Sequence, residues 1–225
     1  MSGPTTFKTA AREQQNILAP LEKRVLAWLA HRMPPWVNSD HLTLLGFAGM
    51  ILTGASYYLA RVNPAFLVAA SGFLAVNWFG DSLDGTLARV RQRQRPRYGF
   101  YVDHIIDAFG TLFLIGGLGL SGYMTPVIAM ILLITYFLLN IELYLATYAI
   151  GVFRLSFGIW GPTELRIVMM AGNLVLLVKP EVVIAGNSRL LCDVAALVAI
   201  AGMAVMVLVN TIRNTAKLYR EERLP

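Results

Sequence analysis

Long apolar segments alternate with short polar breaks along most of the chain. Each segment has about the length that a transmembrane helix needs, and each break contains proline, glycine or charged residues. We place the six apolar segments at 41–61, 64–90, 100–121, 125–150, 162–179 and 189–214. A helix satisfies its backbone hydrogen bonds internally, so an apolar helix of this length can cross a bilayer. The pattern therefore predicts an all-α integral membrane protein with six spans.

A shorter helix is predicted before the first span. Between residues 20 and 33, apolar residues recur at helical spacing, with basic residues between or beyond them. Such a helix either lies in the membrane interface or packs on the rest of its own protein. Pro34–Pro35 ends it, and Asn38 is a candidate cap for the next helix. We therefore divide the chain into an N-terminal cytoplasmic or interfacial segment, 1–36, and a six-helix transmembrane domain, 37–225.

Composition and charge agree with a membrane protein. The chain is 56% hydrophobic and 14% charged, with a mean hydropathy of +0.59, which is too apolar for an ordinary soluble domain. If the N-terminus is cytoplasmic, most lysines and arginines fall on the inner side, so we expect both termini there, in a bacterial cytoplasmic membrane. The net charge of +6 then favours contact with anionic lipids. No basic-aromatic motif indicates a nucleic-acid partner, and Cys192, the single cysteine, excludes an internal disulfide.

Four aspartates interrupt the apolar pattern at the end of the second span and in the third. Asp81 and Asp84 are three residues apart and share a helix face, whereas Asp103 and Asp107 are four apart on the next helix. Two antiparallel helices joined by a short loop can bring all four together. Ionisable groups at membrane depth are costly, so they mark this region as a candidate functional site.

The charge of such a cluster must be neutralised. Four carboxylates in contact repel one another, so either cations bind or some of the groups are protonated. Hard divalent ions suit an all-carboxylate set, and Mg²⁺ or Mn²⁺ suits one that also meets substrate phosphates. Zinc is disfavoured because no cysteine or histidine cluster accompanies the acids.

Two small residues extend the face that carries the first aspartates. Gly85 and Ala88 leave room for either a ligand or a neighbouring helix. Beside the acids we favour a ligand, because glycine within a helix costs about 1 kcal/mol relative to alanine. Arg89 then pairs with a phosphate, or it acts as a counter-ion for Asp81 or Asp84.

The window from 81 to 107 resembles the signature of the CDP-alcohol phosphotransferase family, D-x2-D-G-x2-A-R-x8-G-x3-D-x3-D. The matching residues are Asp81, Asp84, Gly85, Ala88, Arg89, Gly99, Asp103 and Asp107. Nine residues instead of eight separate Arg89 from Gly99, so the arginine-rich loop is one residue longer than in the family pattern. Asp40 and Thr43 look like the family's N/D-x-x-T element at the start of the first span, and 161–166 looks like a segment that precedes the fifth span in some members.

The resemblance implies a six-span enzyme of phospholipid synthesis, usually a homodimer. Such an enzyme transfers a substituted phosphate from a CDP-alcohol to the hydroxyl of an alcohol or lipid acceptor and releases CMP. Asp81, Asp84 and Asp103 would ligate Mg²⁺ or Mn²⁺, with Asp107 near a second ion and also acting as the general base. The residues that would contact the CDP moiety are Gly85, Ala88, Arg89, Asp40 and Thr43.

Four further residues are candidates for binding the acceptor. His104 resembles the Asp-His pair of choline- and ethanolamine-phosphotransferases, or it is a polar neighbour without chemistry. Arg154 and Arg166 lie on the predicted cytoplasmic side and bind an acceptor phosphate, as in members that use inositol phosphate or glycerol phosphate, or they only set the topology. Glu164 is a partner of Arg166 or part of an acceptor pocket. Members use either CDP-diacylglycerol or a soluble CDP-alcohol, and the sequence leaves this choice open.

Two other classes of protein remain as alternatives. A membrane prenyltransferase also binds a diphosphate through aspartates and magnesium, but it carries two distant acidic motifs, and residues 108–225 contain no second acidic cluster. A divalent-cation carrier would line a path with acids, but transporters usually show repeats, and the sequence shows none. The reaction products distinguish the classes: CMP for the phosphotransferase, pyrophosphate for the prenyltransferase and neither for the carrier.

Overall fold

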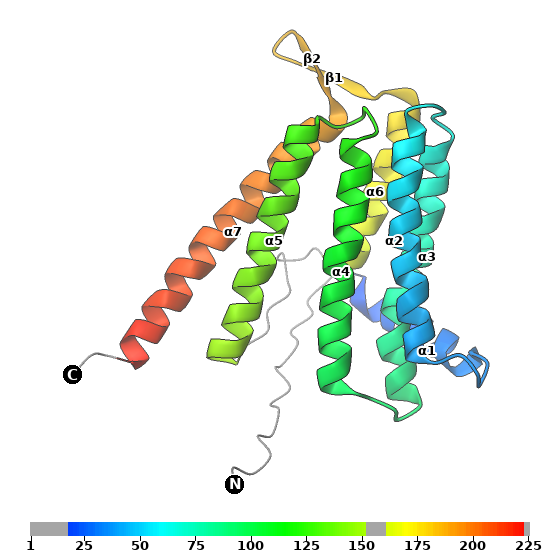
Figure 1. Cartoon of the computed structure of the whole chain (residues 1–225), viewed down its shortest axis with the longest axis vertical. Helices are drawn as coiled ribbons and strands as arrows, with labels where there is room; N and C mark the ends of the chain where they lie inside the picture. Colours follow the sequence, from blue (N-terminus) through cyan, green and yellow to red (C-terminus); the bar gives the residue numbers. More distant parts are fainter. Residues whose placement is uncertain (1–17, 152–160, 223–225) are drawn as a thin grey trace.

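The computed structural model describes residues 18–151 and 161–222 of the chain. In this part the elements follow in the order α1 (Ala19–Arg32), α2 (Ser39–Ala60), α3 (Phe66–Val90), α4 (Pro96–Gly119), α5 (Pro126–Ile150), α6 (Pro162–Val178), β1 (Glu181–Ile184), β2 (Asn187–Leu190) and α7 (Leu191–Glu221). Figure 1 shows α2 to α7 side by side, with the β-hairpin at one end of the bundle. The helix α1 and the loop between α3 and α4 lie at the other end, toward which α7 also runs.

Five helices are long and apolar enough to cross a membrane, and they indicate an integral membrane protein. These helices are α2, α3, α4, α5 and α7. They lie within a few residues of five predicted spans, except that α7 continues past residue 214 to Glu221. The predicted span at 162–179 forms α6, which has 17 residues and a length of about 26 Å, somewhat below the hydrocarbon thickness of about 30 Å. A sixth span therefore stays a prediction.

The segment after α6 differs from the loop that its proline and glycine predict. Glu181–Ile184 pairs antiparallel with Asn187–Leu190, and Gly186 at the turn has a φ of +82°, which favours glycine. Next to the hairpin, Asp193 of α7 accepts hydrogen bonds from the backbone nitrogen (2.7 Å) and the hydroxyl (2.6 Å) of Thr125. The strands are too short for a periodic pattern, which is why sequence reasoning missed them, and the Asp193 bonds join the starts of α5 and α7.

The helix α2 packs against α3 on one side and against α4 on the other. A Cβ added to Gly80 of α3 would lie 2.5 Å from the carbonyl oxygen of Leu42 and 2.7 Å from Cα of Gly46, both in α2. On the other side, a Cβ on Gly117 of α4 would lie 2.6 Å from Cα of Gly54. These distances are shorter than van der Waals contact, so the close approach of the backbones requires glycine. The glycines thus hold α3 and α4 on two sides of one helix.

The helix α1 packs under the end of the bundle that carries the aspartates. Its Leu26 is buried in a core with residues of α2 and α3, and Glu22 accepts hydrogen bonds from Trp78 Nε1 (3.0 Å) and Thr163 Oγ1 (2.6 Å). The predicted helix and its end before Pro34 are thus confirmed. The opposite face of α1 exposes three apolar side chains, those of Leu21, Val25 and Trp28. A position in the membrane interface therefore stays a prediction.

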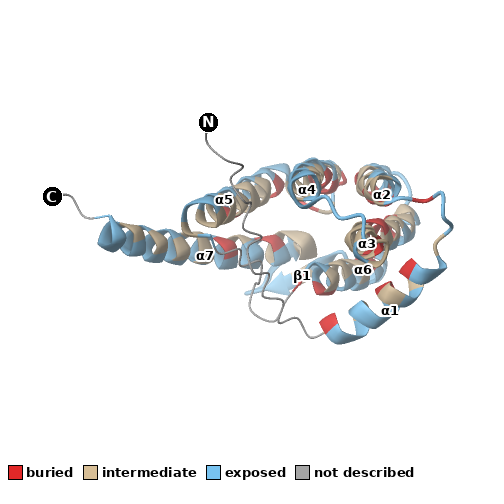
Figure 2. Ribbon diagram, turned by 90° about the horizontal axis from the view of Figure 1, so that it is seen from below, coloured by how far each residue is buried: buried red, intermediate tan, exposed pale blue. Residues whose placement is uncertain are grey.

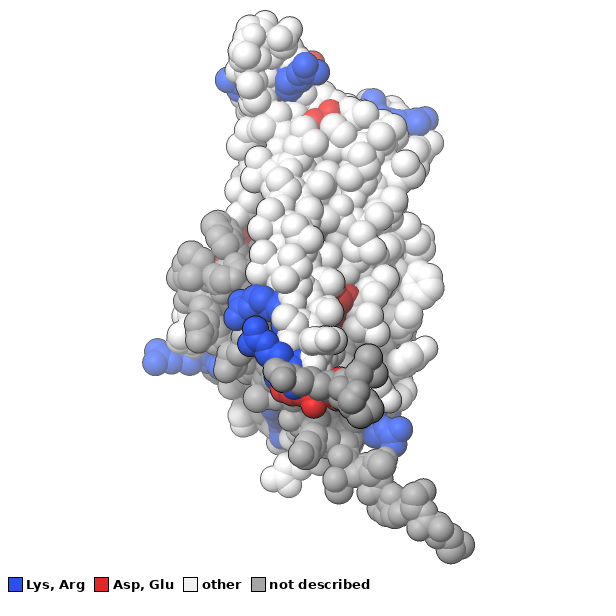
Figure 3. Space-filling model, turned by 90° about the vertical axis from the view of Figure 1, so that its left-hand side faces the viewer, with Lys and Arg blue, Asp and Glu red and all other residues white. Residues whose placement is uncertain are grey.

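The helices α5 and α7 form an arm beside the other helices (Figure 2). They contact each other, and Glu142 of α5 accepts a hydrogen bond of 2.7 Å from Asn214 of α7. In α7 only Ala196 and Met203 are buried. Figure 3 shows a broad uncharged surface between charged side chains at the two ends of the molecule. Such a surface suits lipid contact.

Replacing Gly80 with alanine should destabilise the bundle. The new Cβ would meet the α2 backbone, and overpacking of this kind costs about 1–3 kcal/mol of unfolding free energy. Gly72→Ala is the matched control on the same helix, because a Cβ there meets nothing within 4 Å. Thermal unfolding of the detergent-solubilised variants measures the difference. Equal melting temperatures for the two variants would contradict the glycine contact.

Candidate active site

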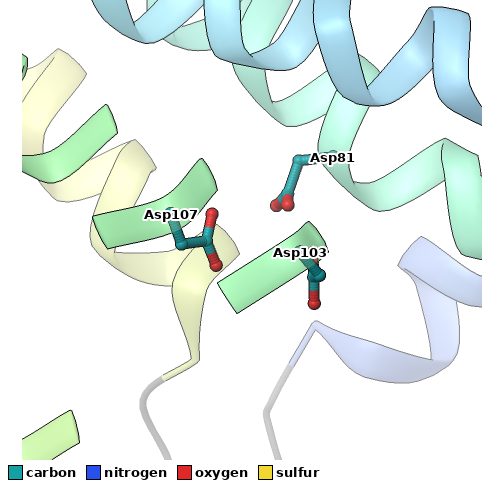
Figure 4. Close-up of side chains that lie close together, drawn as sticks. All are labelled: Asp81, Asp103 and Asp107. Atoms are coloured by element: carbon teal, nitrogen blue, oxygen red, sulfur yellow. The ribbon is translucent and has the colours of Figure 1, made fainter. Parts of the chain in front are cut away.

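Three of the four predicted aspartates meet between α3 and α4. One carboxylate oxygen from each of Asp81, Asp103 and Asp107 lies within 4.8 Å of the others. Figure 4 shows that Asp81 comes from α3, whereas Asp103 and Asp107 come from successive turns of α4. All three residues are partly buried. The spacing of these aspartates along the chain therefore places three of their carboxylates in one cluster.

A narrow cavity lies beside this cluster, with about 10 Å³ accessible to the centre of a water molecule. Its walls come from three helices and combine acids with small and apolar residues. The lining residues are Thr43, Gly46, Phe47, Met50, Asn77, Asp81, Asp103, Ile106 and Asp107. The helix α2 thus forms one wall of the cavity that the aspartates share.

An arginine from α6 pairs with the cluster. Arg166 Nη2 lies 2.6 Å from Asp81 Oδ2, and only 14% of the arginine side chain is exposed. Its other terminal nitrogen, Nη1, is buried and has no hydrogen-bond partner among the described residues. One guanidinium cannot balance three ionised carboxylates, and these hard oxygen donors are of the kind that Mg²⁺ and Mn²⁺ take. The donor set therefore fits a divalent cation.

Asp84, the fourth predicted metal ligand, lies outside the group of three. Its Oδ2 accepts a hydrogen bond of 2.5 Å from the hydroxyl of Thr43, and its Oδ1 accepts one from the backbone nitrogen of Gly85. Its backbone carbonyl also accepts from Ser39 Oγ at 2.7 Å. The structure thus directs Asp84 toward the start of α2, and it gives Thr43, a predicted CDP contact, the role of holding this carboxylate.

Gly85, beyond Asp84 on α3, is not packed tightly against another helix in the described part of the chain. Among the described residues, a Cβ on Gly85 would meet only Nη1 of Arg89, at the ordinary contact distance of 3.5 Å. Arg89 Nη2 donates to Thr86 Oγ1 at 2.9 Å, within the same helix. Gly85 therefore does not serve close helix packing, as Gly80 does, and the space beside it suits a ligand.

Two arginines of the α3–α4 loop connect this loop to the region around the start of α2. Arg91 Nη2 donates to the carbonyl oxygens of Met33 (3.0 Å) and Pro34 (2.9 Å), and Arg95 pairs with Asp40. Sequence reasoning grouped these arginines with the basic residues of the predicted inner side and missed the contacts. The accepting carbonyl groups lie in the segment between α1 and α2, and no local pattern in the sequence marks them as partners of these arginines. Asp40, a predicted CDP contact, is thus engaged with the loop.

The predicted acceptor-binding residues take separate positions. His104 Nδ1 lies 2.6 Å from the carbonyl oxygen of Phe100, and its ring centroid is 5.0 Å from that of Tyr144. Glu164 is buried and accepts bonds of 3.0 Å from the backbone nitrogens of Gly161 and Leu18. It therefore caps α6, while Arg166 pairs with Asp81 instead. Arg154 lies outside the described residues, and acceptor binding by this set stays a prediction.

Sequence reasoning missed Asn77, which lines the cavity one helical turn before Asp81. Its side-chain nitrogen donates to the carbonyl oxygen of Gly46 at 3.0 Å. Only 3% of the residue is exposed, and its Oδ1 has no hydrogen-bond partner in the described part of the chain. The signal in the sequence was an amide residue four positions before an aspartate, inside an otherwise apolar segment.

Comparisons with known proteins agree with the site. A family model described as CDP-alcohol phosphatidyltransferase matches residues 36–213, which include every aspartate of the cluster. The chain is also similar to the archaetidylinositol phosphate synthase of Methanothermobacter thermautotrophicus. The two are 28% identical over 165 residues, which cover 71% of this chain and 76% of the relative. With most of its length matched by the family model, the chain belongs to the CDP-alcohol phosphatidyltransferase family.

Proposed function

We propose that this protein transfers a substituted phosphate from a CDP-alcohol to an acceptor hydroxyl and releases CMP, at the cytoplasmic face of the membrane. Its family supports phosphatidyl transfer in phospholipid synthesis. The observation that carries the proposal is the convergence of Asp81, Asp103 and Asp107 within 4.8 Å. Open space beside Gly85, on the same helix as Asp81, adds room for the nucleotide.

The carboxylates are proposed to hold two Mg²⁺ or Mn²⁺ ions, with Asp84 as an additional ligand. When bound, these ions would neutralise negative charge on the diphosphate and on the departing CMP. The partly buried setting strengthens this effect, because charges interact more strongly where water is scarce. Gly85 and Ala88 would let the CDP moiety approach α3, with Arg89, Asp40 and Thr43 around it.

Asp107 is the proposed general base. It lies one turn, about 6 Å, further from the α3–α4 loop than Asp103, and it lines the cavity. In this position its carboxylate would take the proton from the acceptor hydroxyl. The acceptor oxygen then attacks the β-phosphorus, the bond from that phosphorus to the bridging oxygen breaks, and CMP leaves with that oxygen.

The acceptor is proposed to be a phosphorylated polyol, such as an inositol phosphate. The name of the similar archaeal protein contains an inositol phosphate. Arg166 supports the proposal, because its Nη2 is held by Asp81 while its buried Nη1 has no partner among the described residues. A guanidinium with a free donor is suited to a phosphate oxygen. The CDP-alcohol would then be the lipid substrate.

We also propose that the enzyme is a homodimer with both termini in the cytoplasm. Apolar side chains exposed along α5 and α7 support contact with lipid or a second copy. Basic residues of the α3–α4 loop and of the α7 C-terminus support the orientation, because positive charge concentrates on the cytoplasmic side.

Release of CMP tests the proposed reaction. Purified protein in detergent should produce CMP from a CDP-linked lipid and inositol phosphate, and chelation of divalent metal should abolish the product. A panel with soluble CDP-alcohols and diacylglycerol tests the opposite substrate choice. Pyrophosphate from prenyl diphosphates would indicate a prenyltransferase, and metal transport without nucleotide turnover would indicate a carrier.

Asp107→Asn should lower turnover by about 10²–10⁴-fold, the usual contribution of a general base. The amide keeps the shape of the side chain but cannot accept the proton. Mn²⁺ binding, measured by electron paramagnetic resonance in the same preparation, shows whether the metal site survives. Wild-type turnover in a variant that still binds metal would disprove the role of Asp107.

Arg166→Lys should raise the KM for the phosphorylated acceptor about tenfold or more, because an ammonium group cannot hold Asp81 and a phosphate with two separate nitrogens. Initial rates at varied acceptor concentration measure this effect. The dissociation constant for the CDP-linked lipid serves as the internal control. An unchanged acceptor KM would exclude Arg166 from the acceptor site.

A further inference from the structure

Asn77 is the polar side chain of the cavity whose role the proposed reaction leaves unexplained. It is 3% exposed, so water from outside does not solvate it. It also lies four residues before Asp81 and on the same face of α3, about 6 Å further from the α3–α4 loop. The residue therefore lies at the end of the cavity that is further from the α3–α4 loop than Asp81, which we call the inner end.

The hydrogen bond to α2 fixes the orientation of the Asn77 amide. The carbonyl oxygen of Gly46 can only accept, so the nitrogen of the amide must face it, at 3.0 Å. The opposite orientation would place two acceptor oxygens against each other. Oδ1 is therefore the atom without a partner in the described part of the chain.

A buried amide oxygen without a hydrogen bond costs roughly 1–3 kcal/mol. An apolar residue of the same size would avoid this cost, so the oxygen indicates a ligand that donates a hydrogen bond. The neighbouring carboxylates of Asp81 and Asp107 have no hydrogen to donate when they are ionised. The cavity has about 10 Å³ accessible to a water centre, close to what one water molecule needs.

We propose that Asn77 Oδ1 accepts a hydrogen bond from a water molecule that the bound divalent cation retains at the inner end of the cavity. This inference rests on the proposed metal site. Mg²⁺ and similar ions keep several of their waters when carboxylates bind them. An acceptor that orients such a water stabilises the bound ion, and loss of an outer-shell partner of this kind typically costs 10–100-fold in metal affinity. Asn77 is thus a positioning residue that acts through water.

Two substitutions at Asn77 separate the role of the oxygen from that of the packing bond to Gly46. Asn77→Leu removes both the oxygen and the nitrogen. Asn77→Asp replaces the nitrogen with a second oxygen, which loses the bond to Gly46 and adds a negative charge, but it keeps an oxygen at the inner end. The matched control is Asn173→Leu. Asn173 is also buried, at 2% exposure, but it bonds to Tyr57 at 2.9 Å and Ser71 at 3.0 Å, outside the cavity.

The measurement is Mn²⁺ binding to the purified full-length protein in detergent, followed by electron paramagnetic resonance. Asn77→Leu should raise the dissociation constant about tenfold or more, whereas Asn77→Asp and Asn173→Leu should not raise it. Thermal unfolding without metal reports the packing cost of each variant separately.

Three results would overturn the inference. Asn77→Leu could bind Mn²⁺ as tightly as the wild type, or Asn77→Asp could lose as much affinity as Asn77→Leu. Asn173→Leu could also lose that much, which would show that lost packing weakens the site from a distance. Absence of Mn²⁺ binding in the wild type would instead disprove the proposed metal site itself, so the two failures are distinguishable.

Discussion

The close contact of α2 with both α3 and α4 is the constraint on which the candidate site depends. Gly46 and Gly80 let the backbones of α2 and α3 approach, and Gly54 and Gly117 do the same for α2 and α4. Larger side chains at these positions would hold the helices further apart, because the distance between helix axes depends on the side chains at the contact. The carboxylate of Asp81 comes from one partner of α2, and those of Asp103 and Asp107 come from the other. The distances between the acids are therefore set mainly by glycines that carry no chemistry.

Charge and hydrogen bonding then arrange the side chains that the helices bring together. Arg166 draws Asp81 toward α6, and Thr43 draws Asp84 toward α2. The carboxylates on α3 consequently point in different directions, although they share a helix face. Asp81 therefore lies beside the two aspartates of α4, whereas Asp84 lies beside the start of α2.

The end of the bundle near the site is further organised by contacts between loops and helix ends. Arg91 donates to the carbonyl groups of Met33 and Pro34, which lie between α1 and α2. Glu22 joins α1 to α3 and α6 through Trp78 and Thr163. These polar contacts fix α1 and the segment that follows it against α3 and α6. Residues outside the family signature therefore organise the end of the bundle that carries the aspartates.

The sequence by itself determined the features that depend on local chemistry. Apolar length predicted six spans, and five of them form helices long and apolar enough to cross a membrane. Prolines marked the end of α1, and helical spacing placed Asp103 and Asp107 on one face, because these properties involve only near neighbours in the chain. The tertiary structure alone decided which groups from distant segments meet. The pairing of Arg166 with Asp81, the separation of Asp84 from the cluster and the position of Asn77 depend on how each helix is rotated and packed. That rotation results from the sum of many contacts across the bundle, which no single segment encodes.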